Sequence, residues 1–162
     1  GPAAVRYPRG RGPGVVIEED MTALPIGVSR TVRDGDRIAL LAFGSMVTSA
    51  LAAGDELGAT VVDMRFVKPL DEDRILALAE SHELLVTLEE NVVAGGAGSG
   101  VNETLARAGV RTAVLNLGFE DRFPAHGSAD AELTAQGLDA TGILARVRAR
   151  LEPDRREQSS AG

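Results

Sequence analysis

The sequence contains no cysteine, which excludes disulfide bonds, catalytic thiols and thiolate metal sites. Histidine occurs only at His82 and His126, so a histidine-based metal cluster is not expected. No stretch approaches the roughly 18 apolar residues of a transmembrane helix, and the opening residues show no signal-peptide pattern. We therefore expect a cytoplasmic protein that uses neither thiol nor histidine–metal chemistry.

A basic surface is also missing. Aromatic residues make up 3% of the sequence, the net charge is −7, and no basic segment is interleaved with aromatic residues. An acidic chain of this kind is repelled by the phosphates of nucleic acid and by anionic lipid headgroups. We expect neither a nucleic-acid partner nor a membrane partner.

The apolar content is sufficient for one domain with a real core. Of the 162 residues 44% are hydrophobic, and the mean hydropathy is close to zero. Residues 1–27 begin with a segment rich in glycine, proline and arginine, and are interpreted as a connector. Because the sequence opens at Gly1 without a methionine, in a segment that cannot fold alone, we expect a piece of a longer protein.

Residues 59–103 form the unit around which the other elements are arranged. The segment VVDMRFV (61–67) is apolar on both faces, as is typical of a strand covered on both sides. Pro69 then breaks the chain, and Asp71 can cap a helix that leads to a second buried strand at 84–90. A strand, a helix and a strand within so few residues predict a parallel, right-handed βαβ unit.

Further elements extend this unit on both sides. Asp34-Gly35 is a hairpin signal and predicts that strands at 28–35 and 37–44 pair antiparallel. Another strand is expected at 110–118. Helices are expected to follow the glycine loop and to begin at three capping residues, Ser45, Ser128 and Thr141.

The order of these elements predicts the fold class. We expect a three-layer α/β/α domain over residues 28–152, with a mixed five-stranded sheet that has one antiparallel edge strand. The polar residues 153–162 are predicted to be a disordered tail.

The glycine loop GGAGSG (95–100) resembles a dinucleotide-binding fingerprint but does not match it. The motif G-x-G-x-x-G requires a third glycine where Val101 stands, and residues 91–94 separate the loop from the preceding strand. The loop is more typical of a tight turn in which the backbone packs closely against a neighbour or a helix start. Anion binding by the free N–H groups of the following helix stays open as the alternative.

Glu89 and Glu90 are paired carboxylates at the end of a strand, where sites form in α/β sheets. No histidine, serine or metal ligand lies near them in sequence, so a structural role as caps or interface hydrogen-bonding groups is favoured. His82 follows a helix whose dipole favours a cation there, which indicates a structural role. His126, in a polar loop before Ser128, has no identified partner and is a weaker catalytic candidate.

The segment RYPRGRG (6–12) carries three arginines separated by glycine and proline. Their guanidinium groups are suited to binding a phosphate or a carboxylate. A solvated basic linker explains the same composition equally well, so the residues alone leave both interpretations open.

Several segments, in consistent order and spacing, resemble the 1-deoxy-D-xylulose-5-phosphate synthase family of the transketolase superfamily. They are RYPRG (6–10), MRFVKPLDE (64–72), LEEN (88–91) and GGAGSGVNE (95–103). The resemblance covers residues 1 to about 150 and is to the C-terminal part of that family. It implies that residues 1–27 are the tail of the pyrimidine-binding domain with its linker, and that residues 28–152 are a transketolase C-terminal domain. The segment FED (119–121) departs from the Leu-Pro-Asp of the family.

The resemblance implies an enzyme that condenses pyruvate with glyceraldehyde 3-phosphate on thiamin diphosphate and releases CO2, supplying precursors of isoprenoids, thiamin and pyridoxal. It also implies that thiamin diphosphate and Mg²⁺ are bound by upstream domains absent here, and that the enzyme is a homodimer. No catalytic, cofactor-binding or metal-binding residue is then expected in this chain, which alone should be inactive. By motif position, Arg9 binds the phosphate of glyceraldehyde 3-phosphate, with Arg6 assisting.

Two alternatives belong to other classes. The chain can be a stand-alone, non-catalytic subunit of a split thiamin enzyme, which predicts tight association with a chain that carries the missing domains. It can also be the C-terminal domain of another transketolase-like enzyme, although MRFVKPLDE favours the synthase.

Overall fold

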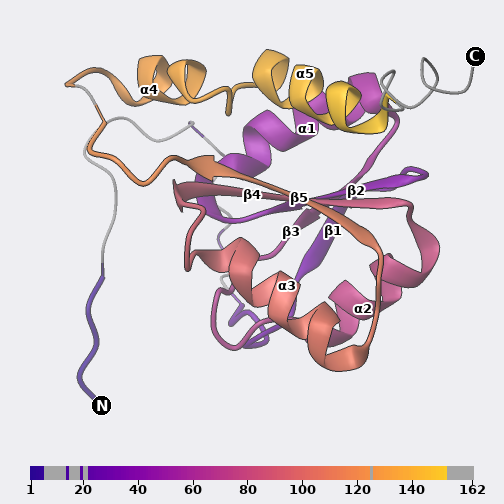
Figure 1. The fold of residues 1–162 in the computed structure, drawn as a ribbon. Coiled ribbons are helices and arrows are strands. Elements are labelled where there is room, and N and C mark those ends of the chain that lie inside the picture. Colours follow the sequence, from indigo (N-terminus) through magenta and orange to yellow (C-terminus); the bar gives the residue numbers. More distant parts are fainter. Residues whose placement is uncertain (6–13, 15–18, 20–21, 125, 153–162) are drawn as a thin grey trace, which may run out of the picture.

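The computed structural model describes residues 1–5, 14, 19, 22–124 and 126–152. Five strands form one sheet in the order β1-β3-β2-β4-β5, with helices on both faces (Figure 1). The strands are β1 (Arg30–Arg33), β2 (Ile38–Ala42), β3 (Thr60–Asp63), β4 (Leu84–Val92) and β5 (Ala113–Phe119). The helices are α1 (Val47–Leu57), α2 (Glu72–Ser81), α3 (Ala97–Ala108), α4 (Ala129–Ala135) and α5 (Ala140–Leu151).

The predicted three-layer fold with a mixed sheet is confirmed. Strands β2, β3, β4 and β5 are parallel, and only β1 runs antiparallel to its neighbour. Helices α1 and α5 cover one face, while α2 and α3 cover the other (Figure 1). No helix of the described ranges is long and apolar enough to cross a membrane.

The predicted hairpin between the first two strands is wrong. β1 pairs with β3, with Arg30 opposite Asp63, and not with β2. Instead of closing a hairpin, the Asp34-Gly35 turn packs on the residues that precede β3, where a Cβ on Gly35 would lie 2.3 Å from the carbonyl carbon of Ala59. The wholly buried β2 therefore occupies the centre of the sheet, and the arginine-bearing β1 takes the edge.

The strand predicted over 61–67 is shorter in the structure. β3 ends at Asp63, and Arg65 adopts a positive φ of 57°, which an extended strand cannot contain. The side chain of Asp63 accepts a hydrogen bond from the Arg65 backbone N–H at 3.2 Å. The apolar run therefore continues beyond the strand as a loop.

Each face of the sheet carries its own apolar core. Alternate residues of β2 and β4 point to opposite faces, so that Leu40 and Val86 belong to the core under α1 and α5. Leu41 and Leu85 belong to the core under α2 and α3. All four side chains are fully buried, which explains why these strands read as continuous apolar runs.

Two of the predicted caps are confirmed and two are wrong. Asp71 accepts from the Arg74 N–H, and Ser128 accepts from the Ala131 N–H. Thr141 does not cap α5, because the carboxylate of Asp139 begins this helix earlier, accepting from the Gly142 N–H at 2.8 Å. Ser45 lies inside a 3-10 turn (Gly44–Met46) that precedes α1, and its hydroxyl donates a hydrogen bond to Glu90 and not to the helix.

Asp71 also ties the start of the domain to α2. Its Oδ2 atom accepts hydrogen bonds from both the backbone N–H and the hydroxyl of Ser29, each at 2.7 Å. Partial burial disfavours the ionised carboxylate, but the hydrogen bonds from Ser29 and from the Arg74 N–H outweigh it. They hold the pKa of Asp71 below its usual value.

We predict that Asp71→Ala lowers the free energy of unfolding by about 1–3 kcal/mol, since it removes both a helix cap and the partner of Ser29. Because the folded-state pKa lies below the unfolded value, this stabilisation is present above about pH 4 and is lost as the pH falls through the folded pKa. Urea unfolding at pH 7 and at pH 3 measures both effects. Asp73→Ala, an exposed carboxylate in the same first turn, is the control; an equal loss in the two variants would contradict the prediction.

Candidate functional site

The topology places a crevice at the carboxyl ends of β2 and β4. The two strands are parallel neighbours, with Ala42 opposite Leu88. From β2 the chain continues into α1 on one face of the sheet, whereas from β4 it continues into α3 on the other face (Figure 1). Open α/β sheets bind ligands at such a switch point, so this edge is the candidate site.

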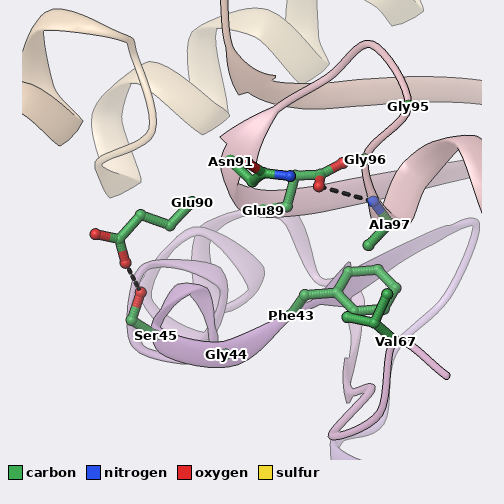
Figure 2. A pocket seen from close by; sticks show the side chains of 10 residues that line it. All are labelled: Phe43, Gly44, Ser45, Val67, Glu89, Glu90, Asn91, Gly95, Gly96 and Ala97. Atoms are coloured by element: carbon green, nitrogen blue, oxygen red, sulfur yellow. Dashed lines mark hydrogen bonds between the residues drawn. The ribbon is translucent and has the colours of Figure 1, made fainter. Parts of the chain in front are cut away.

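A pocket of about 460 Å³ lies at this edge. Its lining comes from the segment after β2, the loop after β3, the end of β4 and the start of α3, namely Phe43, Gly44, Ser45, Val67, Glu89, Glu90, Asn91, Gly95, Gly96 and Ala97. Figure 2 shows Phe43 and Val67 together on one side and the Glu90–Ser45 pair on the other. The pocket therefore joins an apolar wall to a polar one.

Glu89 is the central polar residue of the site. Its side chain is buried, and its two carboxylate oxygens accept hydrogen bonds from the first N–H groups of α3, at 2.8 Å from Ala97 N and 2.9 Å from Gly98 N (Figure 2 shows the first). These N–H groups have no partner within the helix. The negative charge also lies at the positive end of the helix dipole. The structural role predicted for Glu89 is confirmed.

The glycine loop is shaped by this contact. A Cβ on Gly96 would lie 2.3 Å from Glu89 Oε2, and a Cβ on Gly98 would lie 2.5 Å from Thr87 Oγ1. Gly95 has a positive φ of 73°. The loop is therefore a close backbone approach at a helix start, as predicted. Its N–H groups at Ala97 and Gly98 are not free for an external anion, because Glu89 already occupies them.

Glu90 lies on the opposite side of the strand and is exposed. Its carboxylate accepts a hydrogen bond from the hydroxyl of Ser45, across the crevice (Figure 2). The sequence analysis missed this pair, because no serine lies near Glu90 in sequence. Knowing that β2 and β4 are neighbours would have revealed it, since Ser45 lies shortly after β2 and Glu90 lies in the last part of β4.

The other candidate residues do not meet at this pocket. His82 lies beyond α2, with Nε2 2.9 Å from Thr60 Oγ1 and Nδ1 3.0 Å from the Leu78 carbonyl oxygen, which supports a structural role. Thr60 is the first residue of β3, so this contact lies at the amino-terminal end of the parallel strands, whereas the pocket lies at their carboxyl ends. His126 is exposed in the loop before α4. Arg6 and Arg9 lie outside the described residues.

Thiamin diphosphate and Mg²⁺ do not fit the described site. A diphosphate at the start of α3 would compete with the Glu89 carboxylate for the same N–H groups. Within the described residues, no group of three or more histidine, cysteine, aspartate or glutamate side chains could hold a metal ion. What the pocket does offer is the Glu90 carboxylate, the Ser45 hydroxyl and an apolar wall of Phe43 and Val67.

Comparison with protein families gives a match to "Transketolase, C-terminal domain" over residues 27–143. The chain belongs to the transketolase C-terminal domain family. This stretch contains all five strands and the first four helices, together with the beginning of α5. The pocket is thus a feature within the transketolase C-terminal domain.

Curated relatives place the chain more narrowly. It is 58% identical over 151 residues to the 1-deoxy-D-xylulose-5-phosphate synthase of Thioalkalivibrio sulfidiphilus, covering 93% of this chain and 24% of the relative. It is 57% identical over 156 residues to the synthase of Alcanivorax borkumensis, covering 96% of this chain and 24% of the relative. The chain therefore spans about a quarter of the length of the curated relatives that it matches.

Solved structures agree with the fold. A structure described as "Split gene transketolase, inactive beta4 tetramer" matches with a TM-score of 0.70 and 31% identity, covering 79% of this chain and 42% of that chain. A transketolase from Pichia stipitis, 21% identical, matches with a TM-score of 0.54 over 75% of this chain and 17% of that chain, which shows the shared fold alone.

We predict that Glu89→Ala lowers the free energy of unfolding by about 2–4 kcal/mol, because it leaves two buried N–H groups of α3 without an acceptor. Glu90→Ala, the adjacent exposed carboxylate, should change it by at most about 0.5 kcal/mol. Urea denaturation of both variants measures the difference. Similar values for the two would show that the α3 contact does not stabilise the domain.

Two glycines of α3 should respond in opposite directions to a methyl group. Gly98→Ala should destabilise by about 1–3 kcal/mol, because its Cβ would collide with Thr87 and Asn116. Gly100→Ala should stabilise by about 0.5–1 kcal/mol, since its Cβ meets only Leu70 Cδ2 at an ordinary 3.5 Å and alanine favours a helix. Thermal unfolding of both variants decides; a shift of the same sign would refute the close-packing account.

Proposed function

We propose that this chain is the C-terminal part of a 1-deoxy-D-xylulose-5-phosphate synthase. The observation that carries the proposal is the 58% identity to such a synthase over 93% of the chain. The whole enzyme would transfer the two-carbon unit of pyruvate to glyceraldehyde 3-phosphate on thiamin diphosphate, releasing CO2 in the cytoplasm. Mg²⁺ and thiamin diphosphate would be held by other parts of the enzyme. The thiamin cofactor would supply the carbanion chemistry.

Within this enzyme the described domain would act as a scaffold. Residues 28–152 would form the C-terminal domain, and residues 1–27 the end of the pyrimidine-binding domain with its linker. The Glu89 contact supports a non-catalytic role, because the helix start that commonly receives phosphate in α/β folds is occupied by the chain itself. The domain would pack against the upstream domains and contribute to a homodimer.

The proposal is tested by supplying pyruvate, glyceraldehyde 3-phosphate, thiamin diphosphate and Mg²⁺ to the full-length protein and to this chain alone. The full-length protein should release CO2 and form 1-deoxy-D-xylulose 5-phosphate, whereas the chain alone should form none. Sugar-phosphate synthesis by the isolated chain would overturn the scaffold role. A full-length protein that accepts another donor and does not decarboxylate pyruvate would overturn the synthase assignment.

Arg9, assisted by Arg6, is proposed to bind the phosphate of glyceraldehyde 3-phosphate. A charge-assisted contact of about 1.5–3 kcal/mol predicts that Arg9→Ala in the full-length enzyme raises the KM for this substrate roughly 10–100-fold. The KM for pyruvate should not change. Arg11→Ala is the matched control in the same segment, and steady-state kinetics with each substrate varied in turn are the measurement. An unchanged KM for the aldehyde would exclude Arg9 from phosphate binding.

A second candidate function is a non-catalytic subunit of a split enzyme. It is favoured by the match to a structure described as a split gene transketolase, at 31% identity and a TM-score of 0.70. A separate chain carrying the thiamin-binding domains should then bind this one tightly. Size-exclusion chromatography of the mixed chains tests it, and elution as two separate species would count against it.

A further inference from the structure

The pocket at the carboxyl ends of β2 and β4 has no backbone donor available for an anion along the loop that leads into α3. Every N–H group of residues 95–99 already has an acceptor within the chain. Those of Ala97 and Gly98 donate to Glu89. The other three donate from Gly95 to Ser99 Oγ at 3.1 Å, from Gly96 to the Val93 carbonyl oxygen at 3.2 Å, and from Ser99 to the Gly96 carbonyl oxygen at 3.1 Å. The start of α3 therefore contributes no donor for a phosphate or a carboxylate.

The charge that the pocket presents is negative. Its two ionisable lining residues are carboxylates, Glu89 and Glu90, and the charge of Glu89 is offset by the start of α3. Glu90 is exposed, and within the described ranges its carboxylate accepts a hydrogen bond from the neutral Ser45 hydroxyl and takes part in no ion pair. The basic residues of the loop after β3, Arg65 and Lys68, do not line the pocket. The pocket therefore offers one uncompensated negative charge, at Glu90.

An apolar wall lies across the pocket from this charge. Figure 2 shows Phe43 and Val67 together on the side away from the Glu90–Ser45 pair. Val67 belongs to neither core and is 62% exposed, so its apolar surface is open to a ligand. A hydrated metal ion would leave this wall uncovered, whereas a volume of about 460 Å³ is typical of sites for small organic molecules.

A primary ammonium group attached to an apolar body satisfies both walls at once. An ammonium has three N–H donors and no acceptor. It can donate to the Glu90 carboxylate and to the Ser45 hydroxyl oxygen, whose own hydrogen is already directed to Glu90. The apolar body then covers Val67 and contacts Phe43. We propose that this pocket is a binding site for an organic cation of this kind. The inference does not depend on the proposed reaction, because every contact lies within the described domain.

Three probes of nearly equal size and different charge test the site on the full 162-residue chain. Benzylamine is a cation at pH 7, benzyl alcohol is neutral and benzoate is an anion. In an NMR titration, benzylamine should shift the amide signals of Gly44, Gly95 and Gly96, with a dissociation constant of about millimolar. Benzyl alcohol should bind about tenfold more weakly, and benzoate should leave these signals unmoved. An affinity for benzyl alcohol or benzoate equal to that for benzylamine would overturn the proposal.

Substitutions in each wall test the assigned contacts. Glu90→Gln removes the charge and keeps the shape, and should weaken benzylamine binding about tenfold. Val67→Ala removes part of the apolar wall and should weaken it about threefold. Glu103→Gln, an exposed carboxylate on α3 outside the pocket, is the matched control and should leave the dissociation constant unchanged. The amide spectrum reports in the same experiment that each variant is folded. Unchanged affinity in Glu90→Gln would refute the cation site.

The same chemistry has two sources, a free amine or a lysine side chain of the part of the enzyme that this chain does not span. Saturation-transfer NMR with benzylamine on the full-length protein separates them. A signal that Glu90→Gln abolishes in both proteins means that the pocket receives a free amine. A signal that depends on Glu90 in this chain but is absent from the full-length protein means that the enzyme's own side chain occupies the pocket. No Glu90-dependent signal in this chain would overturn the proposal. Neither arm uses the substrates, so a failed activity test leaves their outcome intact.

Discussion

The Glu89 carboxylate accepts hydrogen bonds from the first N–H groups of α3. The structure at the carboxyl ends of the parallel strands depends on this contact. It joins the end of a central strand to the start of a helix on one face of the sheet. Gly96 and Gly98 lie against this carboxylate and against the strand, so a larger residue at either position would have to displace the helix start. Because the charge is buried, removing its partners or the carboxylate itself leaves unpaired polar groups in the interior.

The same contact determines what the edge can do. In open α/β sheets, the switch point combines a crevice with free N–H groups at a helix start, and this combination receives phosphates. Here the crevice remains, at about 460 Å³, but its anion-binding groups are satisfied internally. A domain built this way keeps a crevice at the switch point without free N–H groups at Ala97 and Gly98.

The two edge strands of the sheet, β1 and β5, differ in length and in charge. β1 forms one edge and carries arginines and a bulge, and the hydrogen bonds from Ser29, just before β1, to Asp71 connect this segment to α2. β5 carries no charged residue, and Asn116 is the polar residue at its middle.

The sequence by itself determined the fold class, most element positions, and the structural character of the glycine loop and Glu89. These follow from local rules: alternation, apolar runs, and polar residues at helix starts. Only the tertiary structure decided that β2 lies between β3 and β4. As a result β1 pairs with β3 and forms no hairpin with β2, and Ser45 lies within hydrogen-bonding distance of Glu90. Strand order depends on which strand best tolerates burial on both faces. That competition involves the whole chain, and no local pattern of residues records its outcome.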